Sequence, residues 1–418
     1  MKESKKFEKK SILTWGIPLT LIVVLLLIRV PQLTLSSGQA DAYPQNFSAS
    51  AILAKKIMEE VAIGGTSAPV ASRLYAYPLL ASYLPFQDTS LPKNINLQAT
   101  SLLAGAYVFK EIHPNPFVKN TALSLIRKGE LMLTKEESKE SLKWAKEYAD
   151  RVLKIARNDG YDQSVKTYNP PATLGKYDWR PTGFDKQAPL ESGWGGLKTL
   201  NQASEECTLE LPSTMGVFDE QALALGKQDD TLGNTANVIW WLAGFGTPTP
   251  SGQWLNIAML AAKDHNLNPE ETSRLLATMA VSAFDTSIKT WYYKYKFHVV
   301  RPQNLYITLT GQYYNLYRDT PNHPSYPGGH SAFSGSAGTI LINTIGDVPI
   351  RDALGEDVLV PKEVRNFNSV TEAIKAASQS RIDAKFHYPI DTTAGEQLGS
   401  CIAKNIDINK LIKEQKLV

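Results

Sequence analysis

Apolar residues recur at intervals of three and four along most of the chain, which is the spacing that gathers them on one face of an α-helix. Thr134 and Glu137 are spaced as a capping box, and Asn268 followed by Pro269 marks another helix start. No run of alternating apolar and polar residues predicts a strand, so the chain is predicted to be all-α. Helices are predicted over 46–63, 68–84, 134–156, 268–297, 330–347 and 361–380.

Residues 160–215 interrupt this pattern with prolines, glycines and aromatic side chains. An irregular stretch of this length inside a domain is usually either functional or disordered. Trp179 and Trp194 argue against disorder, because disordered segments are poor in large aromatic residues. The stretch is therefore predicted to be an ordered loop packed over the helices.

The N-terminus follows a different pattern. Residues 1–10 carry five lysines and two glutamates, and an uncharged apolar run extends from Ile12 to Ile28. This run is long enough for a transmembrane helix over 11–30 with the lysines on the cytoplasmic side. A signal peptide cleaved near Ala40 is the alternative. Both interpretations predict an extracytoplasmic domain, either secreted or anchored to the membrane.

Composition, net charge and cysteine content restrict the possible size of the core, the partners and the cellular compartment. With 418 residues the chain can bury a sizeable core, and its formal net charge of +3, without a basic stripe interleaved with aromatics, argues against nucleic acid as a partner. Cys207 and Cys401 lack metal-ligand spacing and are candidates for a disulfide in an oxidising compartment. The predicted parts are a cytoplasmic basic tail at 1–10, an anchor or signal at 11–30, a polar linker at 31–46 and one helical domain at 47–418.

Three short stretches carry charged or titratable side chains in patterns that indicate chemistry. In the first, Lys294 and Arg301 are seven residues apart, or about two helical turns, so a continuous helix would point both in one direction. Pro302 then limits how far such a helix runs undisturbed. Taken alone, this pair is more typical of a solvated helix face.

The second stretch, HPSYPGGHSAF, occupies residues 323–333. Its prolines and the pair Gly328-Gly329 interrupt any preceding helix, and the residues from His330 onward can form the next one. Glycine N–H groups at a helix N-terminus form an anion site, because they carry no Cβ and the helix dipole adds positive potential. The alternative is a tight turn that feeds a closely packed helix.

In the third stretch, Arg381 follows one predicted helix and Pro389 indicates the start of another. His387 and Asp391 are four residues apart. On one helix they would share a face, and the carboxylate would fix the imidazole tautomer that a nucleophilic or metal-bound histidine needs. A buried structural histidine is the alternative.

Together the three stretches supply three cations, a glycine-rich helix start and two histidines. Cations and backbone N–H groups neutralise a tetrahedral oxyanion. One histidine would then attack or ligate its central atom, and the other would act as a general acid or base.

This arrangement resembles the superfamily that joins type 2 phosphatidic acid phosphatases, soluble bacterial acid phosphatases and vanadium-dependent haloperoxidases. Its signature is K-x6-R-P, then P-S-G-H, then S-R-x5-H-x3-D. The matching residues are Lys294…Arg301-Pro302, Pro327-Gly328-Gly329-His330 and Ser380-Arg381…His387…Asp391. Upstream segments at 67–83, 179–200 and 284–302 resemble the bacterial haloperoxidase-like branch, so the resemblance spans about 65–405, with the motif-bearing part at 284–405. It implies an all-α helical bundle of the acid phosphatase/vanadium haloperoxidase type.

The resemblance also implies roles for individual residues. His387 would be the vanadium ligand or the nucleophile that accepts phosphate, with Asp391 as its partner, and His330 would be the acid–base group. The residues implied to bind the oxygens of vanadate or phosphate are Lys294, Arg301, Gly328, Gly329 and Arg381.

The chain departs from the signature at Gly328, where the family carries serine. One hydroxyl donor to the oxyanion is therefore missing, a loss of about 1 kcal/mol, and Ser325 is a candidate to replace it. His323 stands five residues before Gly328, where some bromide-oxidising relatives also carry a histidine, and is a candidate auxiliary residue.

Three functions are consistent with these residues. The first is an extracytoplasmic haloperoxidase that binds vanadate at His387 and oxidises halide with hydrogen peroxide. The second is a phosphatase that hydrolyses phosphomonoesters, lipid phosphates among them, through a phosphohistidine. The third is an inactive oxyanion-binding protein, in which glycine at position 328 instead of serine would reflect the loss of activity. The expected partners are small-molecule substrates and, through the N-terminal helix, a membrane.

Overall fold

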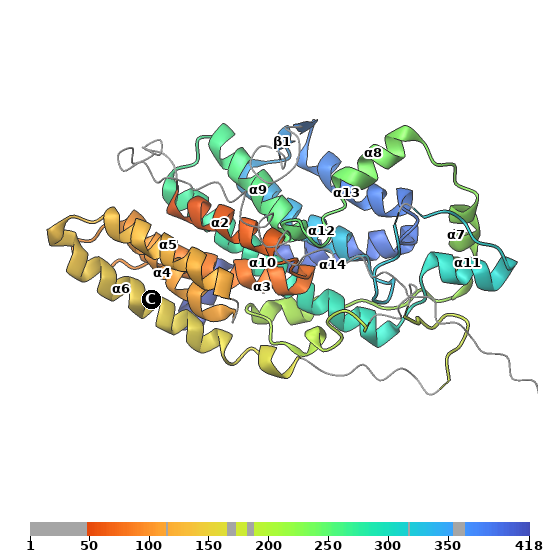
Figure 1. Ribbon diagram of the computed structural model, residues 1–418, viewed down its shortest axis with the longest axis horizontal. Helices are drawn as coiled ribbons and strands as arrows, with labels where there is room; N and C mark the ends of the chain where they lie inside the picture. Colours follow the sequence, from red (N-terminus) through yellow and green to blue (C-terminus); the bar gives the residue numbers. More distant parts are fainter. Residues whose placement is uncertain (1–47, 114–115, 165–172, 182–187, 317, 354–363) are drawn as a thin grey trace, which may run out of the picture. The chain divides into compact units, whose positions relative to one another are not determined.

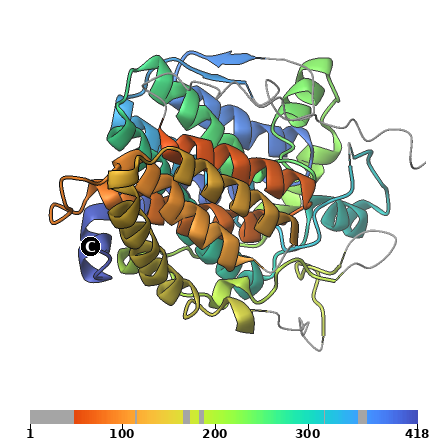
Figure 2. The same ribbon diagram turned by 60° about the vertical axis from the view of Figure 1, so that its left-hand side comes forward.

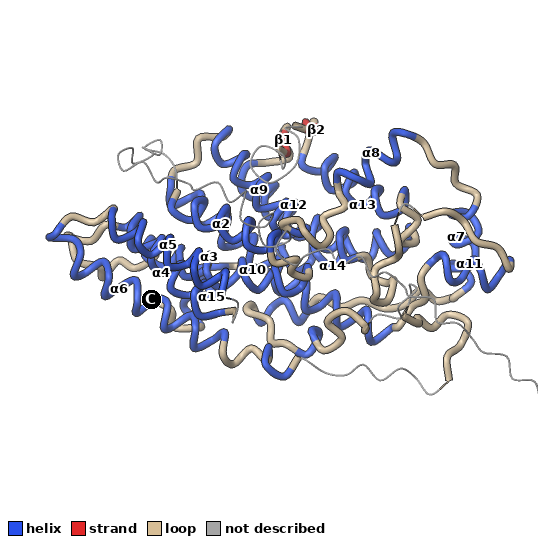
Figure 3. The backbone as a smooth tube through the Cα atoms, viewed as in Figure 1, coloured by secondary structure: helices blue, strands red, loops and turns tan. Residues whose placement is uncertain are grey.

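The computed structural model describes residues 48–113, 116–164, 173–181, 188–316, 318–353 and 364–418. Within these ranges the chain is mostly helical, as predicted (Figures 1 and 3). The α-helices are α2 (Ala49–Ile63), α3 (Ala68–Tyr83), α4 (Leu97–Ile112), α5 (Pro116–Leu131), α6 (Lys135–Ala156), α7 (Gly216–Gly226), α8 (Leu232–Trp240), α9 (Thr249–Asp264), α10 (Pro269–Phe297), α11 (Pro302–Thr310), α12 (Gly329–Ile345), α13 (Val370–Asp383), α14 (Pro389–Asn405) and α15 (Ile408–Glu414). Short 3-10 turns are η1 (Leu84–Phe86), η2 (Tyr161–Gln163), η3 (Trp194–Gly196) and η4 (Gln202–Glu206).

The predicted capping signals are confirmed. Thr134 accepts a hydrogen bond from the backbone N–H of Glu137 at the start of α6, and the Glu137 carboxylate accepts one from the backbone of Thr134. Asn268 and Glu271 form the same reciprocal pair at the start of α10. Each box satisfies backbone donors that have no partner within the helix, which fixes where the helix begins.

The prediction for 361–380 is wrong in its first half. The helix there, α13, begins at Val370, because the Ser369 side chain accepts a hydrogen bond from the backbone of Glu372. Just before it, β2 (Arg365–Phe367) pairs antiparallel with β1 (Ile350–Asp352), with Ile350 opposite Phe367. Strands of three residues are too short to show an alternating pattern in the sequence.

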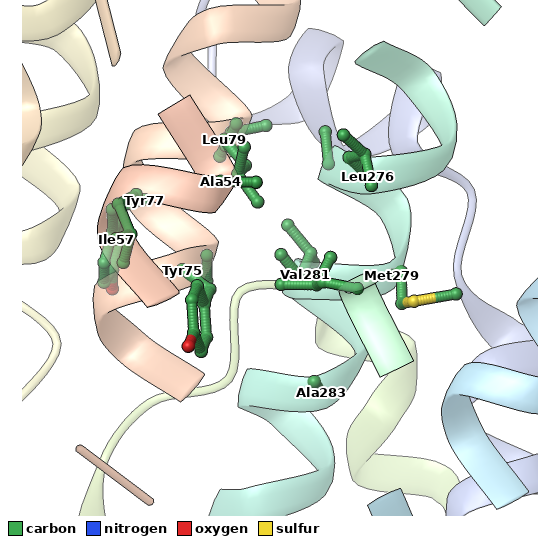
Figure 4. Packing of buried hydrophobic residues seen from close by; sticks show 14 of the residues in the cluster. Ala54, Ile57, Tyr75, Tyr77, Leu79, Leu276, Met279, Val281 and Ala283 are labelled. Carbon is green, nitrogen blue, oxygen red and sulfur yellow. The ribbon is translucent and has the colours of Figure 1, made fainter. Parts of the chain in front are cut away.

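One apolar core joins α2, α3, α4, α6, α9, α10 and α12. Figure 4 shows side chains of α2 and α3, including Ile57 and Tyr75, on one side of this core and those of α10, including Leu276 and Val281, on the other. The helices α5 and α6 both pack against α4, which in turn packs against α3 (Figure 2). Burial of these faces is the main force that holds the helices together.

The helices α12 and α14 approach each other closely near the centre of the fold (Figure 1). A Cβ atom on Gly395 would lie 2.3 Å from the carbonyl oxygen of Gly328, and one on Gly399 would lie 2.0 Å from that of Ala332. Only glycine permits such contacts between backbones. They bring the glycine-rich start of α12 next to the start of α14.

The described parts of 160–215 form an ordered loop, as predicted. Trp179 and Trp194 are fully buried. The buried carboxylate of Asp285, on α10, accepts hydrogen bonds from the backbone N–H groups of Leu200 at 2.7 Å and Asn201 at 3.0 Å. These bonds fasten the loop to the longest helix of the core.

Cys207 and Cys401 form a disulfide with their Cα atoms 5.9 Å apart. The bond joins the end of η4 to α14 across a sequence separation of 194 residues. It therefore fastens the loop to the helix whose first turn carries Asp391.

Within the ranges that the structure describes, no helix is both long and apolar enough to cross a membrane. The predicted anchor or signal at 11–30 and the linker at 31–46 lie outside the described residues.

Candidate active site

The three sequence stretches converge where α10, α12, α13 and α14 meet. Lys294 lies in the last turn of α10, Gly328 caps the start of α12, and Arg381 lies in the last turn of α13. A cavity of about 600 Å³ opens here. Its wall includes His323, Gly329, His330, Arg381 and His387.

His387 is held by Asp391. The Nδ1 atom of His387 lies 2.8 Å from Oδ2 of Asp391, which also accepts hydrogen bonds from Ser325 Oγ at 2.6 Å and Tyr388 N at 3.2 Å. A carboxylate only accepts, so Nδ1 carries the proton and Nε2 is unprotonated, where it accepts a hydrogen bond from Arg301 Nη1 at 3.1 Å. Because α14 begins at Pro389, His387 precedes the helix, and the expectation that both residues share a helix face is corrected. The pair instead closes the turn that leads into α14.

Arg381 has a buried donor that is not used. Its Nε donates to Ser380 Oγ at 3.0 Å, and its Nη1 lies 3.3 Å from Nε2 of His330. Its Nη2 is buried and has no hydrogen-bond partner among the described residues. Arg381 lies inside α13, not after it as the sequence suggested.

His330 is oriented by a backbone carbonyl. Its Nε2 lies 3.1 Å from the carbonyl oxygen of Leu242. Since a carbonyl only accepts, we assign the proton to Nε2, which leaves Nδ1 as the basic nitrogen. The contact with Arg381 Nη1 then brings two N–H groups together and is not a hydrogen bond.

Lys294 is buried behind the cavity wall. Its Nζ donates to three backbone carbonyls, those of Pro324 at 3.0 Å, Ser325 at 2.8 Å and Pro327 at 2.5 Å. Burial and the nearby Arg301 lower the pKa of Lys294, but three acceptors call for the three N–H groups of an ammonium. Lys294 thus adds positive charge to the site while it holds the loop before α12.

Arg301 also supports the wall from behind. Its Nε donates to the carbonyl of His323 at 2.9 Å, and its Nη1 lies 2.9 Å from the carbonyl of Phe386 and 3.1 Å from Nε2 of His387. The sequence placed Lys294 and Arg301 on one helix face, which is wrong. The helix α10 ends at Phe297, and Arg301 caps α11, so a turn of the chain brings the two cations together.

The site is electropositive. Its cluster holds three buried cations and one buried carboxylate, Asp391, whose pKa burial raises to about 6. Burial lowers the pKa of Arg381 to about 9, so it stays protonated at neutral pH. Burial and the adjacent guanidinium groups lower the pKa of His387 and of His330, so both rings are neutral there. A buried excess of positive charge favours an anionic ligand.

Residues 306–412 match the family model of the VCPO second helical-bundle domain, a range that includes His330, Arg381, His387 and Asp391. The crystal structure of the first bacterial vanadium-dependent iodoperoxidase aligns with a TM-score of 0.76 and 20% identity, over 87% of this chain and 97% of that chain. The chain has the fold of the vanadium haloperoxidases.

Bacterial vanadium-dependent chloroperoxidases share this fold. The apo-type structure aligns with a TM-score of 0.60 and 13% identity, over 86% of this chain and 95% of that one. The holo-type structure gives a TM-score of 0.60 and 14% identity, over 90% and 97%. No curated protein matches the chain. These comparisons confirm the fold that the three motifs predicted, and the family model agrees with the resemblance over residues 306–412.

Within this vanadium-haloperoxidase fold, Gly329 faces the cavity and Gly328 does not. The Gly328 N–H donates to the carbonyl of Asp391 at 2.8 Å, and a Cβ at this position would lie 3.1 Å from the same oxygen. A Cβ on Gly329 would have no neighbour closer than 3.8 Å. Ser325, the candidate replacement for the missing serine, donates to Asp391 instead of facing the cavity.

His323 lies in the cavity wall beside Arg301. Its Nδ1 is 3.1 Å from Nη2 of Arg301, and its ring centroid is 5.2 Å from that of Trp291. Burial and the cations Lys294 and Arg301 lower its pKa. The structure therefore brings His323 into the site, and its auxiliary role stays a prediction.

Other parts of the wall were missed in the sequence. Leu242 acts through its backbone carbonyl, which leaves no signal in the residue type. Leu190 and Phe245 come from irregular segments, whose contacts no periodicity predicts. Trp291 precedes Lys294 by three residues and Phe333 follows His330 by three, so helical spacing could have identified both.

Three features of the wall fit vanadate. His387 presents an unprotonated nitrogen, Arg381 an unpaired buried donor, and Gly329 a helix N-terminus without a side chain. These are a ligand for the central atom and donors for the oxygens of a tetrahedral oxyanion.

Proposed function

We propose that this chain is an extracytoplasmic haloperoxidase that holds vanadate at His387 and oxidises halide with hydrogen peroxide. The supporting observation is the pair His387–Asp391, which leaves Nε2 unprotonated in the same cavity wall as the unused donor of Arg381. Phosphate has the same shape and charge type as vanadate. The aligned structures are vanadium-dependent iodo- and chloroperoxidases, which favours vanadate.

Each side chain has a task in this proposal. Vanadate, when bound, supplies a Lewis-acidic centre that activates hydrogen peroxide toward halide. Nε2 of His387 would be its protein ligand, and Nη2 of Arg381 with the N–H of Gly329 would neutralise the charge on its oxygens. Asp391 keeps the proton of His387 on Nδ1. His330, neutral at Nδ1, accepts a proton from hydrogen peroxide.

The protonation state of His330 distinguishes the two chemistries. A phosphatase of this type needs a protonated His330 to donate to the leaving group. Burial and Arg381 lower the pKa of His330 and thus favour the neutral base that peroxide deprotonation needs.

The disulfide between Cys207 and Cys401 supports the extracytoplasmic location, because such bonds persist in oxidising compartments. In the proposal, the apolar segment at 11–30 delivers the domain across the membrane, as an anchor or as a signal.

The test is a pair of assays on the full chain, the first in the presence of vanadate and the second after vanadate has been removed by dialysis, because vanadate would occupy the site of a phosphate ester. Triiodide formation from iodide and hydrogen peroxide measures the haloperoxidase, and release of p-nitrophenol from its phosphate ester measures the phosphatase. His387→Ala should abolish triiodide formation, and His265→Ala, at an exposed position outside the cavity, should leave it unchanged. Ester hydrolysis without triiodide would establish the phosphatase. Vanadate binding without either product would establish an inactive binding protein.

A further inference from the structure

A second cavity lies beside the last turns of α6. It has a volume of about 470 Å³, and it shares no lining residue with the cavity at His387. Its wall is built mainly from the end of α6, the loop segment 198–200 and the residues that follow α15. The proposed haloperoxidase reaction does not use this cavity.

Four cations from these three segments line the cavity, namely Arg151, Lys154, Lys198 and Lys416. Nη2 of Arg151 lies 3.6 Å from Oε2 of Glu147, so this carboxylate offsets part of its charge. The three lysines are exposed and form no ion pair with any residue that the structure describes. Cations gathered around one concave surface repel one another and attract an anion, because the cavity concentrates their field.

Asp159 is the one carboxylate among the residues that line this cavity. Its Oδ2 accepts hydrogen bonds from Arg73 Nε at 2.7 Å and from the Tyr77 hydroxyl at 2.9 Å, and its Oδ1 accepts one from Tyr161 N at 2.8 Å. Arg73 and Asp159 are both buried, so this ion pair neutralises the carboxylate within the protein. The charge that the wall presents to a ligand is therefore positive.

Hydrogen bonds hold the three segments in place. The backbone N–H of Lys198 donates to the carbonyl of Asp159 at 2.8 Å. Nη1 of Arg151 donates to the carbonyl of Leu417 at 2.9 Å, which joins α6 to a residue 266 positions further along the chain. The cations are thus brought together before any ligand binds, which lowers the entropic cost of binding.

The size of the cavity points to an organic ligand. A single phosphate or sulfate has five non-hydrogen atoms, which fill about 150 Å³ at the ~30 Å³ that a water molecule takes in the liquid. The cavity has room for about 15 such atoms. Ile155 and Leu200 add apolar surface to its wall, on which a carbon skeleton can lie.

We infer that this cavity binds a small organic molecule that carries two or three anionic groups, a polycarboxylate or an organic phosphate. Its anionic groups would accept charge-assisted hydrogen bonds from Lys154, Lys198 and Lys416, which approach the cavity from different segments. This site is separate from the vanadate site, and the inference does not depend on the proposed function.

The probe is tricarballylate (propane-1,2,3-tricarboxylate), whose 12 non-hydrogen atoms need about 360 Å³ on the same basis. Its three carboxylates are ionised at about pH 7. Calorimetric titration of the full chain, without vanadate and at low ionic strength, should show one saturable site. Added sodium chloride should weaken the binding, because salt screens exposed charges.

Lys154→Glu and Lys198→Glu should each raise the Kd of tricarballylate about 5- to 20-fold, since each change replaces an attraction with a repulsion at a partly solvated position. Lys139→Glu changes the net charge by the same amount at an exposed position of α6 outside the cavity. It is the matched control and should bind like the wild type. The side chains of Lys154 and Lys198 have no ion pair to lose, so both variants should unfold in urea at the wild-type concentration or above it.

Four results would overturn the inference. The first is the absence of saturable binding, and the second is an equal Kd for Lys198→Glu and Lys139→Glu, which would show a diffuse effect of net charge. The third is sulfate that binds as tightly as tricarballylate, which would exclude a ligand with several anionic groups. The fourth is binding that is lost in Arg381→Met and kept in Lys154→Glu and Lys198→Glu, which would place the probe in the vanadate cavity.

Discussion

Arg381→Met should stabilise the chain without vanadate and weaken vanadate binding. Arg381 is 2% exposed, and burial lowers its pKa only to about 9, so a charged donor stays buried without a partner at Nη2. Such an unpaired donor costs about 1–3 kcal/mol. Methionine has a similar length and no polar hydrogen. Ser380 keeps its own hydrogen bond, to the carbonyl of Ala377, after the substitution. The free energy of unfolding should therefore rise by about 1–3 kcal/mol.

The same change removes one charge-assisted hydrogen bond to the oxyanion. Bonds of this kind contribute about 1.5–3 kcal/mol, which corresponds to a Kd about 10- to 150-fold higher. Stability and affinity thus change in opposite directions, which a residue that only supports the fold would not produce.

Urea unfolding without vanadate measures the first effect, and calorimetric titration with vanadate measures the second, both at pH 7. Lys375→Met removes a positive charge from an exposed position of the same helix and should change stability by no more than about 0.5 kcal/mol. If Arg381→Met lowered the stability of the free chain by more than 1 kcal/mol and left vanadate affinity unchanged, the reasoning would be refuted.

Three further changes test other parts of the site. Asp391→Asn removes the charge that supports His387 and should weaken vanadate binding about 10- to 100-fold by calorimetry; equal affinity would contradict the role of the pair. Burial and adjacent cations lower the pKa of His323, so the unfolded chain binds a proton below about pH 6.5 that the folded chain does not. The wild type should therefore lose stability between pH 7 and 5 faster than His323→Gln, by at most about 1.4 kcal/mol per pH unit in urea unfolding; equal slopes would show that His323 titrates normally. Gly328→Ala should destabilise the chain by about 1–3 kcal/mol because its Cβ would lie 3.1 Å from a carbonyl oxygen. Gly329→Ala should leave the free energy of unfolding in urea nearly unchanged and should weaken vanadate binding. If Gly329→Ala destabilised the chain and Gly328→Ala weakened vanadate binding, the assignment of Gly329 to the cavity would be wrong.

The sequence was sufficient to predict the all-α class, several of the helices and the residues that converge, but not the way in which they converge. Capping residues such as Thr134 act within one turn, so local spacing reveals them. Lys294 and Arg301 meet because α10 ends at Phe297 and the chain reverses, a tertiary event that a seven-residue spacing does not describe. The prediction that Lys294 and Arg301 lie close together is correct, but they do not share a helix face.

Gly328 shows how the structure changes the interpretation of a motif. The family signature carries serine at this position, and the absence of its hydroxyl was the main argument for an inactive protein. In the structure, Gly328 packs against the backbone of Asp391, and its N–H is already bonded there. Among the described residues, the donors proposed for an oxyanion are Nη2 of Arg381, which has no partner, and the backbone N–H of Gly329, which lines the cavity. Residue spacing in the sequence does not reveal which donors are already hydrogen-bonded.

The central claim is that His387 and its neighbours form a vanadate-dependent haloperoxidase. The most direct test is the initial rate of triiodide formation by the full chain, freed of oxyanions by dialysis, as vanadate is added back at fixed iodide and hydrogen peroxide. The account predicts no rate without vanadate and saturation at one vanadate per chain. A rate that does not depend on vanadate, or no rate at any vanadate concentration, would contradict it.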